Sequence, residues 1–252
     1  MNDNASPIIQ VKNVTVRYDD RTILENVSFD INRGEIFMIV GGSGCGKSTM
    51  LRQIIGLETP AEGEILIDGI DITKATGKLK KEVLIKFGVL VQSSGLFASM
   101  TLAENIALLL ETYTDISKQR ISELIEIKLA AVGLRGFDSF LPSEISGGMK
   151  KRAALARAMA LDPRILCFDE PSSGLDPVTA ASMDALIREI NSALGTTMVV
   201  VSHDLDGVLT TAQKVIMLDK SVKGIIAQGH PLALKEMKEN PIVYNFFNRL
   251  SE

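Results

Sequence analysis

The chain contains four short apolar runs, at residues 36–40, 89–91, 165–168 and 197–201, in which polar positions do not alternate with apolar ones. Such runs are typical of strands that are buried on both faces of a parallel sheet. Each run ends directly in polar residues or in glycine. Because open α/β sheets bind their ligands beyond the carboxyl ends of the strands, the pattern predicts an α/β fold with a ligand site at that edge.

Two other patterns predict what surrounds this sheet. Residues 8–18 and 23–31 alternate as the strands of an antiparallel layer do, and residues 64–67 add another strand after the turn PAEG. Residues 102–111 and 117–132 have apolar positions at helical spacing. The chain therefore combines an antiparallel β layer, a parallel core and a helical segment.

The run at residues 36–40 leads straight into GGSGCGKST, which meets the phosphate-loop pattern G-x-x-x-x-G-K-[S/T]. Glycines let the backbone N–H groups converge on a phosphate, and the next helix adds its positive dipole end. Lys47 is expected to reach the β and γ phosphates, and Ser48 to ligate Mg²⁺. The alternative, a glycine-rich turn without a ligand, is disfavoured by the strand before it and the helix-like LRQII after it. The expected nucleotide-binding residues are Gly41, Gly42, Ser43, Gly44, Cys45, Gly46, Lys47, Ser48 and Thr49.

This motif makes the core that of a P-loop NTPase, with a mostly parallel sheet flanked by helices. We expect a single domain over residues 1–252. Residues 1–93 and 146–252 would form the core with its antiparallel β edge layer, and residues 94–145 an inserted helical subdomain.

Two carboxylates, Asp169 and Glu170, follow the run at residues 165–168 and precede the breaker Pro171. Adjacent strand residues point to opposite faces, so the two acids are expected to have different tasks. Asp169 would hold Mg²⁺, directly or through a water, and Glu170 would orient and deprotonate the attacking water. The alternative is a solvated acidic strand end, which the nearby phosphate loop disfavours.

His203 and Gln92 follow the two remaining apolar runs. From a strand end, a ring nitrogen of His203 could bond the γ-phosphate and help to hold the water, although a lone histidine is more often structural or on the surface. Gln92 could reach Mg²⁺ or the water, or it could be an ordinary polar strand end. Their position at the phosphate-binding edge favours catalytic roles for both.

A second candidate phosphate site lies at Ser146, Gly147 and Gly148, before the helix-forming segment KKRAALARAMAL. Serine there is an ordinary N-cap, and glycine is common in turns. Exposed N–H groups, a hydroxyl and a helix dipole are also what a γ-phosphate binds. Since residues 41–49 already serve one nucleotide, the second turn would close over the nucleotide of a neighbouring copy in a twofold dimer.

The ordered segments GGSGCGKST, Gln92, ISGGM, ILCFDE, SGLD and SHD resemble the ATP-binding subunit of an ABC transporter over nearly the whole chain. The resemblance implies that Ser146 and Gly148 contact ATP bound to the partner subunit. It also implies that Gln92 is a hinge sensing the membrane subunit and that Asp176 communicates across a homodimer. Tyr18, in VRYDDRTIL, matches the aromatic residue that stacks on adenine in this family, and its alternative is an ordinary strand tyrosine.

The chain departs from the family pattern at three positions. The usual signature LSGGQ has Ile145 and Met149 at its outer positions here. The backbone and serine contacts survive this change, whereas any role of the usual glutamine side chain is lost. The segment SGLD has Gly174 where alanine is more frequent, which would loosen the turn.

Three segments, AAVGLRG, LPSEISGGMKKRAALARAMALDP and NSALGTTMVVVSHD, are similar to the ATPases of the lipid-asymmetry (Mla, toluene-tolerance, MCE-type) phospholipid transporters. This resemblance implies glycerophospholipid as cargo, a separate permease and an MCE-type lipid-binding protein. Another transporter cargo, such as a small solute, is the main alternative.

Other classes of nucleotide enzyme fit less well. A DNA-repair ABC ATPase needs a long coiled-coil insertion, for which the segment between Ser48 and Ser146 is too short. A translation-type ABC protein carries two cassettes, and this chain has one. A GTPase would add the base-reading motif N-K-x-D, which is missing from the sequence.

Composition limits the expected partners and the cellular location of the protein. A net charge of −4 and a pI near 5.4 argue against a nucleic-acid surface, as does an aromatic content of 5%. The apolar runs are shorter than the roughly 18 residues that span a bilayer, and MNDNASP shows no signal-peptide pattern. The two cysteines suit a reducing compartment. We expect a cytoplasmic protein, peripheral on the inner face of the bacterial cell membrane.

Three groups of residues are candidate surfaces. Leu96, Phe97 and Met100 would line a groove for a permease helix or belong to the core of the helical subdomain. Near the C-terminus, an apolar stripe is predicted at Ile242, Val243, Phe246, Phe247 and Leu250. The lysines and arginine at residues 78, 80, 81 and 150–152 are expected on solvated faces, with anionic headgroups a weaker possibility.

Overall fold

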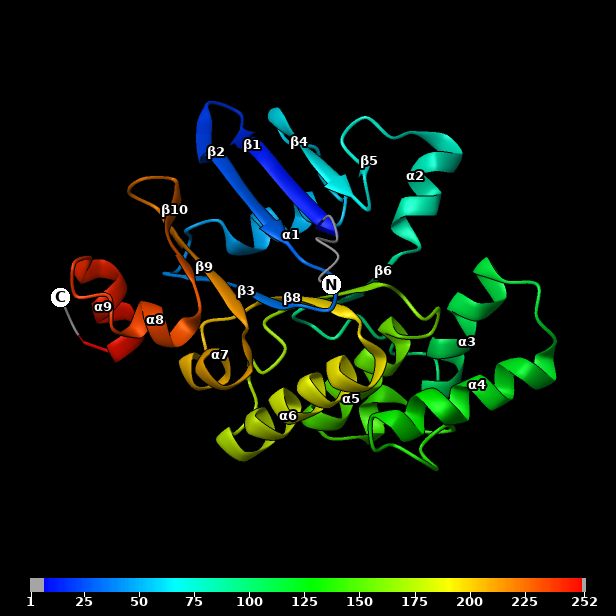
Figure 1. The fold of residues 1–252 in the computed structure, drawn as a ribbon. Helices are drawn as coiled ribbons and strands as arrows, with labels where there is room; N and C mark the ends of the chain where they lie inside the picture. Colours follow the sequence, from blue (N-terminus) through cyan, green and yellow to red (C-terminus); the bar gives the residue numbers. More distant parts are fainter. Residues whose placement is uncertain (1–6, 251–252) are drawn as a thin grey trace, which may run out of the picture.

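Two β-sheets lie one above the other in the computed structural model, which describes residues 7–250 (Figure 1). Helix α1 (Lys47–Ile54) lies between the sheets, and most of the other helices cover the lower face of the larger one. The predicted α/β class with an antiparallel layer is confirmed.

The larger sheet has six strands in the order β10-β9-β3-β8-β7-β6. Neighbouring strands run parallel except for β10, which is antiparallel to β9. Three of the four predicted runs match strands, whereas β6 begins earlier than expected and ends before Val91, which is 38% exposed. The strands are β3 (Ile36–Gly41), β6 (Phe87–Leu90), β7 (Ile165–Asp169), β8 (Thr197–Val201), β9 (Lys214–Asp219) and β10 (Gly224–Gly229).

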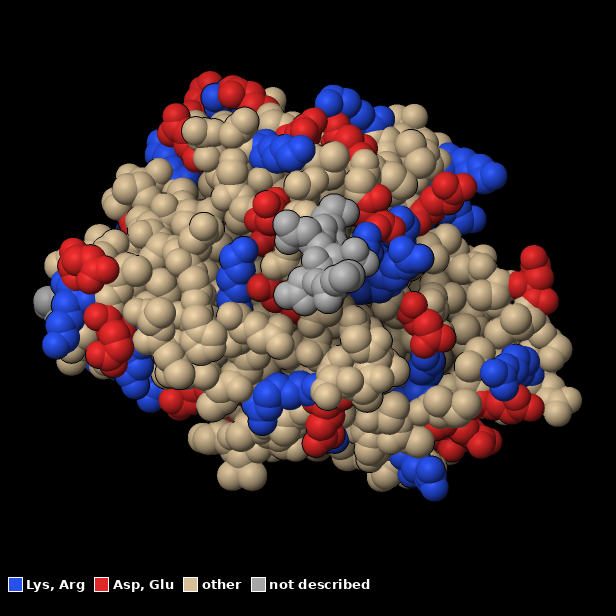
Figure 2. Space-filling model, viewed as in Figure 1, with Lys and Arg blue, Asp and Glu red and all other residues tan. Residues whose placement is uncertain are grey.

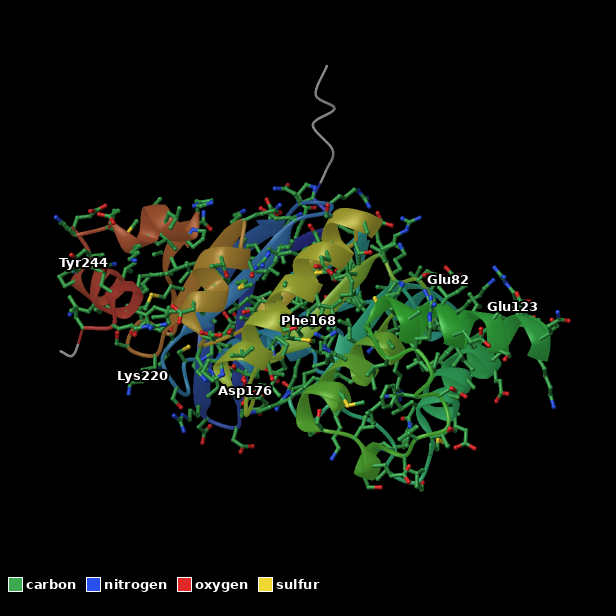
Figure 3. The ribbon with its side chains drawn as sticks, turned by 90° about the horizontal axis from the view of Figure 1, so that it is seen from below. Glu82, Glu123, Phe168, Asp176, Lys220 and Tyr244 are labelled. Carbon is green, nitrogen blue, oxygen red and sulfur yellow. The ribbon has the colours of Figure 1, made fainter. Side chains whose placement is uncertain are left out.

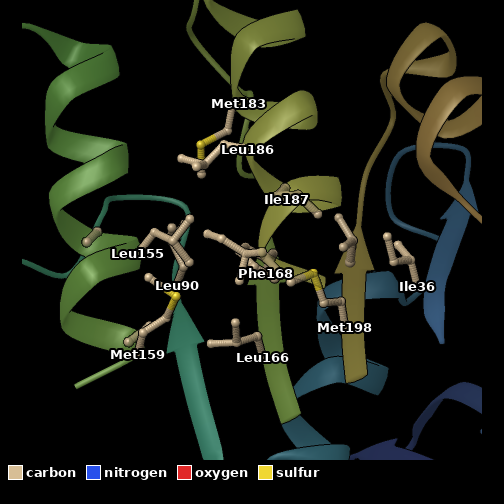
Figure 4. Packing of buried hydrophobic residues seen from close by; sticks show 14 of the residues in the cluster. Ile36, Leu90, Leu155, Met159, Leu166, Phe168, Met183, Leu186, Ile187 and Met198 are labelled. Atoms are coloured by element: carbon tan, nitrogen blue, oxygen red, sulfur yellow. The ribbon is translucent and has the colours of Figure 1, made fainter. Parts of the chain in front are cut away.

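Both faces of β3 are buried, which explains its unbroken apolar sequence. Phe37 and Ile39 belong to the cluster between the two sheets, whereas Met38 and Val40 belong to the cluster beneath the larger sheet. Figure 4 shows the lower cluster, in which Phe168 of β7 lies among side chains from neighbouring strands and helices. Alternate residues thus serve two cores, as the period of a strand requires.

The smaller sheet is antiparallel, with the order β2-β1-β4-β5. Its strands are β1 (Ile9–Tyr18), β2 (Arg21–Ile31), β4 (Glu62–Ile67) and β5 (Ile70–Asp71). The Phe29 ring of β2 stacks on the Phe37 ring of β3, with 5.3 Å between the ring centroids. This contact helps to pack the two sheets together.

Between β6 and β7 the chain is helical, as the sequence predicts. This part contains α3 (Leu102–Tyr113), α4 (Lys118–Ala131), a short 3₁₀ helix, η1 (Pro142–Glu144), and α5 (Gly147–Ala158). Thr101 and Glu104 form a capping box that starts α3. Helix α5 contacts α3 and α4 as well as β6, so it joins the helical segment to the sheet. The division of the chain at residues 94–145 stays a prediction.

The remaining helices are α2 (Gly77–Leu84), α6 (Pro177–Leu194), α7 (Leu205–Thr211), α8 (Pro231–Lys235) and α9 (Pro241–Asn248). In Figure 3, Glu123 of α4 and Tyr244 of α9 lie at opposite ends of the molecule. None of the helices within residues 7–250 has the length and apolarity that crossing a bilayer requires.

The predicted C-terminal stripe is wrong in part. Val243 and Phe247 are buried, but Ile242 is 44% exposed. The helix ends at Asn248 and the next residue has left-handed backbone geometry, so Leu250 lies beyond the helix and is 53% exposed. A spacing of four residues drifts around a helix of 3.6 residues per turn, so only one side of the expected stripe meets the core.

Charged side chains of both signs are interspersed on the face shown in Figure 2. The prediction of solvated basic residues holds for Lys78 and Lys81, which are exposed, whereas Lys80 is half-buried. It is wrong for Lys151, which is only 7% exposed. Arg152 is half-buried and donates to Val132 O and to Ser182 Oγ.

Candidate functional site

The loop at residues 41–49 has a backbone that requires glycine at two positions. Gly41 has φ 141°, and a Cβ there would lie 2.2 Å from Leu218 O. Gly46 has φ 101° and directly precedes α1, where a Cβ would lie 2.9 Å from Leu24 Cδ2. The left-handed backbone and the close packing exclude larger residues. Of the other expected residues, Gly42, Ser43 and Gly44 are exposed, Thr49 is half-buried, and Cys45 is buried.

Lys47, Ser48 and Asp169 are brought together where β3 and β7 end. The Lys47 ammonium donates to Gly41 O at 2.9 Å and to Gly42 O at 3.0 Å, so it is held at the base of the loop. Ser48 Oγ donates to Asp169 Oδ1 at 2.8 Å. This pair links the phosphate loop to the first of the two predicted acids.

The three residues expected at the metal, Ser48, Gln92 and Asp169, line one cavity of about 370 Å³. A hydroxyl, a carboxylate and an amide oxygen fit Mg²⁺, which prefers oxygen ligands. Within residues 7–250, no group of three or more His, Cys, Asp or Glu side chains could hold a metal. A magnesium ion here would therefore depend on nucleotide phosphates and water for its remaining ligands.

Glu170 and His203 are in direct contact, with Glu170 Oε2 2.6 Å from His203 Nδ1. The Glu170 side chain is 12% exposed and the His203 side chain 65% exposed. Glu170 has φ 53°, and its N–H donates to Val201 O at 3.0 Å. The contact with His203 orients the Glu170 carboxylate. Sequence reasoning placed both residues at this edge but did not foresee their contact.

Tyr18 lies beside the phosphate loop. It lines a cavity of about 780 Å³ together with Gly44, Lys220 and Lys223. Tyr18 is 41% exposed, and its hydroxyl donates to Glu58. An exposed aromatic face and two ammonium groups next to the loop can receive a purine nucleotide.

Figure 3 labels Lys220, which lines this cavity, and Asp176, and both lie towards the same edge of the molecule.

The second phosphate turn is exposed and is not joined to the first. Ser146 is the N-cap of α5, and its Oγ accepts from Met149 N at 3.3 Å, so the ordinary cap is present. Ser146 and Gly147 are both exposed. No hydrogen bond within residues 7–250 connects this turn to the loop at residues 41–49. In one protomer the two turns are therefore separate.

Asp176 lies close to the second turn. Its carboxylate caps α6 by accepting from Val178 N and Thr179 N, each at 3.1 Å. The hydrogen bond from the Thr179 hydroxyl is the main cause of the lowered pKa of Asp176. A Cβ on Gly148 would lie 2.6 Å from Thr179 Cγ2, so glycine lets the two loops approach.

The structure corrects the prediction for Lys151 and bears on the alternatives left open for Leu96 and Phe97. Lys151 donates to Gln92 O and Glu170 O, which makes it part of the site. The available signal was its helical spacing, because Lys151 shares one face of α5 with the buried Leu155 and Ala158. Leu96 and Phe97 match different alternatives. Leu96 packs against the lower core, whereas Phe97 is 46% exposed, as a residue lining a groove would be.

A phosphate loop at the end of a parallel strand, an acid bonded to its serine and a histidine-held glutamate together define a P-loop nucleoside triphosphatase. The family model described as "ABC transporter" matches residues 24–173. The chain belongs to this family, and it is an ATPase.

Two curated relatives match most of the chain. It is 41% identical, over 96% of its length and 90% of the relative's, to the intermembrane phospholipid transport system ATP-binding protein MlaF of Haemophilus influenzae. It is also 41% identical, over 95% of its length, to the probable ribonucleotide transport ATP-binding protein mkl of Mycobacterium leprae, of which 68% is covered.

A solved structure has the same fold. The dimeric structure of the ATP-binding cassette MJ0796 in a post-hydrolysis state, bound to ADP and Pi, matches with a TM-score of 0.80 and 30% identity. The match covers 88% of this chain and 98% of that one.

Proposed function

We propose that this ATPase moves glycerophospholipids across a bacterial envelope, acting through a separate permease. The observation that carries the proposal is the 41% identity to MlaF, which spans 96% of this chain and 90% of MlaF. The mkl relative, named for ribonucleotide transport, is equally identical, but only 68% of it is covered. A phospholipid cargo is therefore favoured over a ribonucleotide or another small solute.

Each nucleotide pocket would use the residues grouped around the phosphate loop. The loop amides and Lys47 bind the phosphates of ATP, and Tyr18 stacks on adenine. Mg²⁺ held by Ser48, Gln92 and Asp169 would supply positive charge at the β and γ phosphates. Glu170 accepts a proton from the attacking water, and His203 holds the Glu170 carboxylate in place.

The second turn would complete the pocket of a partner subunit. Two copies related by a twofold axis would place Ser146 and Gly148 of each chain on the ATP of the other, and Asp176 would contact the partner. The exposure of Ser146 and Gly147 and the dimeric state of MJ0796 support this arrangement. Moving a partner between two conformations from 1:99 to 99:1 takes about 5.5 kcal/mol of differential binding, which two shared ATP molecules can supply.

The expected partners follow from the same proposal. A membrane permease would bind the ATPase dimer, and an MCE-type lipid-binding protein would exchange lipid with the permease. The ATPase would then lie in the cytoplasm, peripheral on the inner face of the cell membrane. Nucleic acid is not an expected partner.

The test is to purify the chain from membranes together with its permease and to identify the bound lipid by mass spectrometry. ATP hydrolysis by the complex is expected to rise with added glycerophospholipid and to stay unchanged with an added ribonucleoside monophosphate. Lys47→Ala is the control, since it should abolish hydrolysis but leave the bound lipid in the complex. A complex that holds no lipid, and whose hydrolysis responds to a ribonucleotide or another solute, would exclude the lipid cargo.

A further inference from the structure

We propose that Lys151 is a positioning residue that ties helix α5 to the Gln92 loop and to Glu170 of the same protomer. Through this tie, a partner's ATP bound at the start of α5 would act on the chain's own catalytic site. The inference rests on the proposed function, because it takes Ser146 as a ligand of the partner's ATP and Glu170 as the general base.

Lys151 lies at the junction of three segments. It is on the second turn of α5 and is 7% exposed. Its ammonium donates to Gln92 O at 2.5 Å and to Glu170 O at 3.4 Å. Gln92 follows β6 and Glu170 follows β7, and these strands are neighbours in the sheet. One side chain therefore holds the main chain of both predicted catalytic residues.

Arg157 of α5 makes a second tie to the same loop. It donates to Gly95 O at 2.7 Å, and its guanidinium lies 5.0 Å from the centroid of the Phe97 ring. Ser94 and Gly95 both have left-handed backbone geometry, so the loop turns sharply between the two ties. Because α5 holds the loop at both ends, a shift of the helix must move the loop.

Charge explains why a lysine can occupy this position. Burial lowers the pKa of the Lys151 ammonium, and the charges of Asp169 and Glu170 act in the opposite direction. A buried cation is costly unless it is paired and hydrogen-bonded, and here two carbonyl oxygens accept from it. A methionine of similar length would fill the space without the cost of burying a charge, but it could not make these two hydrogen bonds.

The direction of the coupling follows from the geometry of the helix. Ser146 caps α5, and Lys151 lies five residues later, which is about 7.5 Å along the axis at 1.5 Å per residue. Helical hydrogen bonds make the segment move as a unit. If a partner's γ-phosphate draws in the amides at the start of α5, Lys151 moves with them and shifts Gln92 and Glu170.

The test compares Lys151→Met with Lys150→Met in the full chain, purified with its membrane partner. Lys150 is the matched control because it is the preceding residue, is half-buried, and has no side-chain hydrogen bond or ion pair within residues 7–250. Lys151→Met is expected to lower kcat at least about tenfold while the Kd for ATP stays within about twofold, because its ammonium bonds the Gln92 loop and not the phosphate loop. Lys150→Met should keep both values.

Lys151→Arg keeps the charge and donors and should recover part of the lost kcat. If Lys151→Met does not fold, Lys151→Gln replaces it, since glutamine keeps donors without the charge. A folded Lys151→Met or Lys151→Gln protein with kcat within about twofold of wild type would overturn the proposal. Loss of ATP affinity in step with kcat would do so as well, because it would show a merely structural role.

Hydrogen exchange measures the coupling directly. In a Glu170→Gln background, ATP is expected to slow amide exchange at residues 92–97 when Lys151 is present, and to leave it unchanged in Lys151→Met. Equal protection with and without Lys151 would contradict the coupling. Failure of the assignment of Glu170 as the general base is visible separately, because Glu170→Gln alone would then hydrolyse ATP at the wild-type rate.

Discussion

Glu170 and His203 come from the ends of neighbouring strands and meet side chain to side chain, with 2.6 Å between Glu170 Oε2 and His203 Nδ1. The Glu170 side chain is mostly buried, whereas that of His203 is 65% exposed. The histidine can thus hold the carboxylate with one nitrogen and keep the other available to a ligand. If Glu170 is the general base, the pair would hold this proton acceptor in a fixed position.

Glu170→Gln is expected to lower kcat by about 10²–10⁴, because the amide cannot accept the proton of the attacking water. ATP affinity should persist, and the variant should accumulate as a closed dimer in ATP. Single-turnover hydrolysis and size-exclusion chromatography check both points. Wild-type turnover in this variant would show that another residue is the base.

His203→Ala is expected to lower kcat at least about tenfold with little change in the Kd for ATP, since it frees the Glu170 carboxylate. His230→Ala is the control. His230 is the other histidine of the chain, and it accepts from Leu232 N at the start of α8. Equal kcat values for the two variants would remove His203 from the catalytic machinery.

Ser146→Arg should reduce hydrolysis by about 10²-fold, the scale expected when donors to a developing phosphate charge are lost. The Kd of ATP should stay near that of wild type, because the chain's own phosphate loop is intact. Ser143→Arg, at an exposed position three residues earlier, is the control. If Ser146→Arg lost ATP affinity as Lys47→Ala does, the second turn would belong to the chain's own pocket.

Tyr18→Ala should raise the Kd for both ATP and ADP about tenfold, because base stacking on an aromatic ring contributes about 1–3 kcal/mol. Tyr18→Phe keeps the ring and should stay within about twofold of wild type. Isothermal titration calorimetry measures both. An unchanged Kd in Tyr18→Ala would make Tyr18 an ordinary strand residue.

Asp184 of α6 predicts a dependence of stability on pH. Burial, together with the nearby charge of Asp204, raises its pKa from 3.8 to about 6, against the opposing effect of Arg188. The folded state therefore binds a proton that the unfolded state has released, and stability falls as the pH rises from about 4 to about 6. Above about pH 6, the loss in the free energy of unfolding that Asp184 causes stays constant.

Asp184→Asn removes this titration. Its free energy of unfolding should exceed that of wild type by up to about 3 kcal/mol at pH 7.5, and the two should converge near pH 4. Urea denaturation at both pH values measures the difference, with the exposed Asp115→Asn as control. A difference of the same size at both pH values would show that the titration of the Asp184 carboxyl group does not cause it.

The sequence by itself determined the features that depend on neighbours along the chain. Apolar runs such as that of β3 identify strands buried on both faces, because both of their faces pack against apolar side chains. The phosphate loop is also recognisable from the sequence, because its motif is a run of adjacent residues in which Gly41 and Gly46 provide the positive φ angles. The N-cap at Ser146 is likewise predicted from its position directly before a helix-forming segment.

The tertiary structure decided which polar side chains are buried and what they contact. Lys151 looked like a surface residue, yet it reaches carbonyl oxygens at Gln92 and Glu170, the second of them 19 residues away along the chain. The contact between His203 and Glu170 likewise arises only when two strands align. A long polar side chain carries no sequence signal for its partner, because the partner's position is set by the packing of other elements.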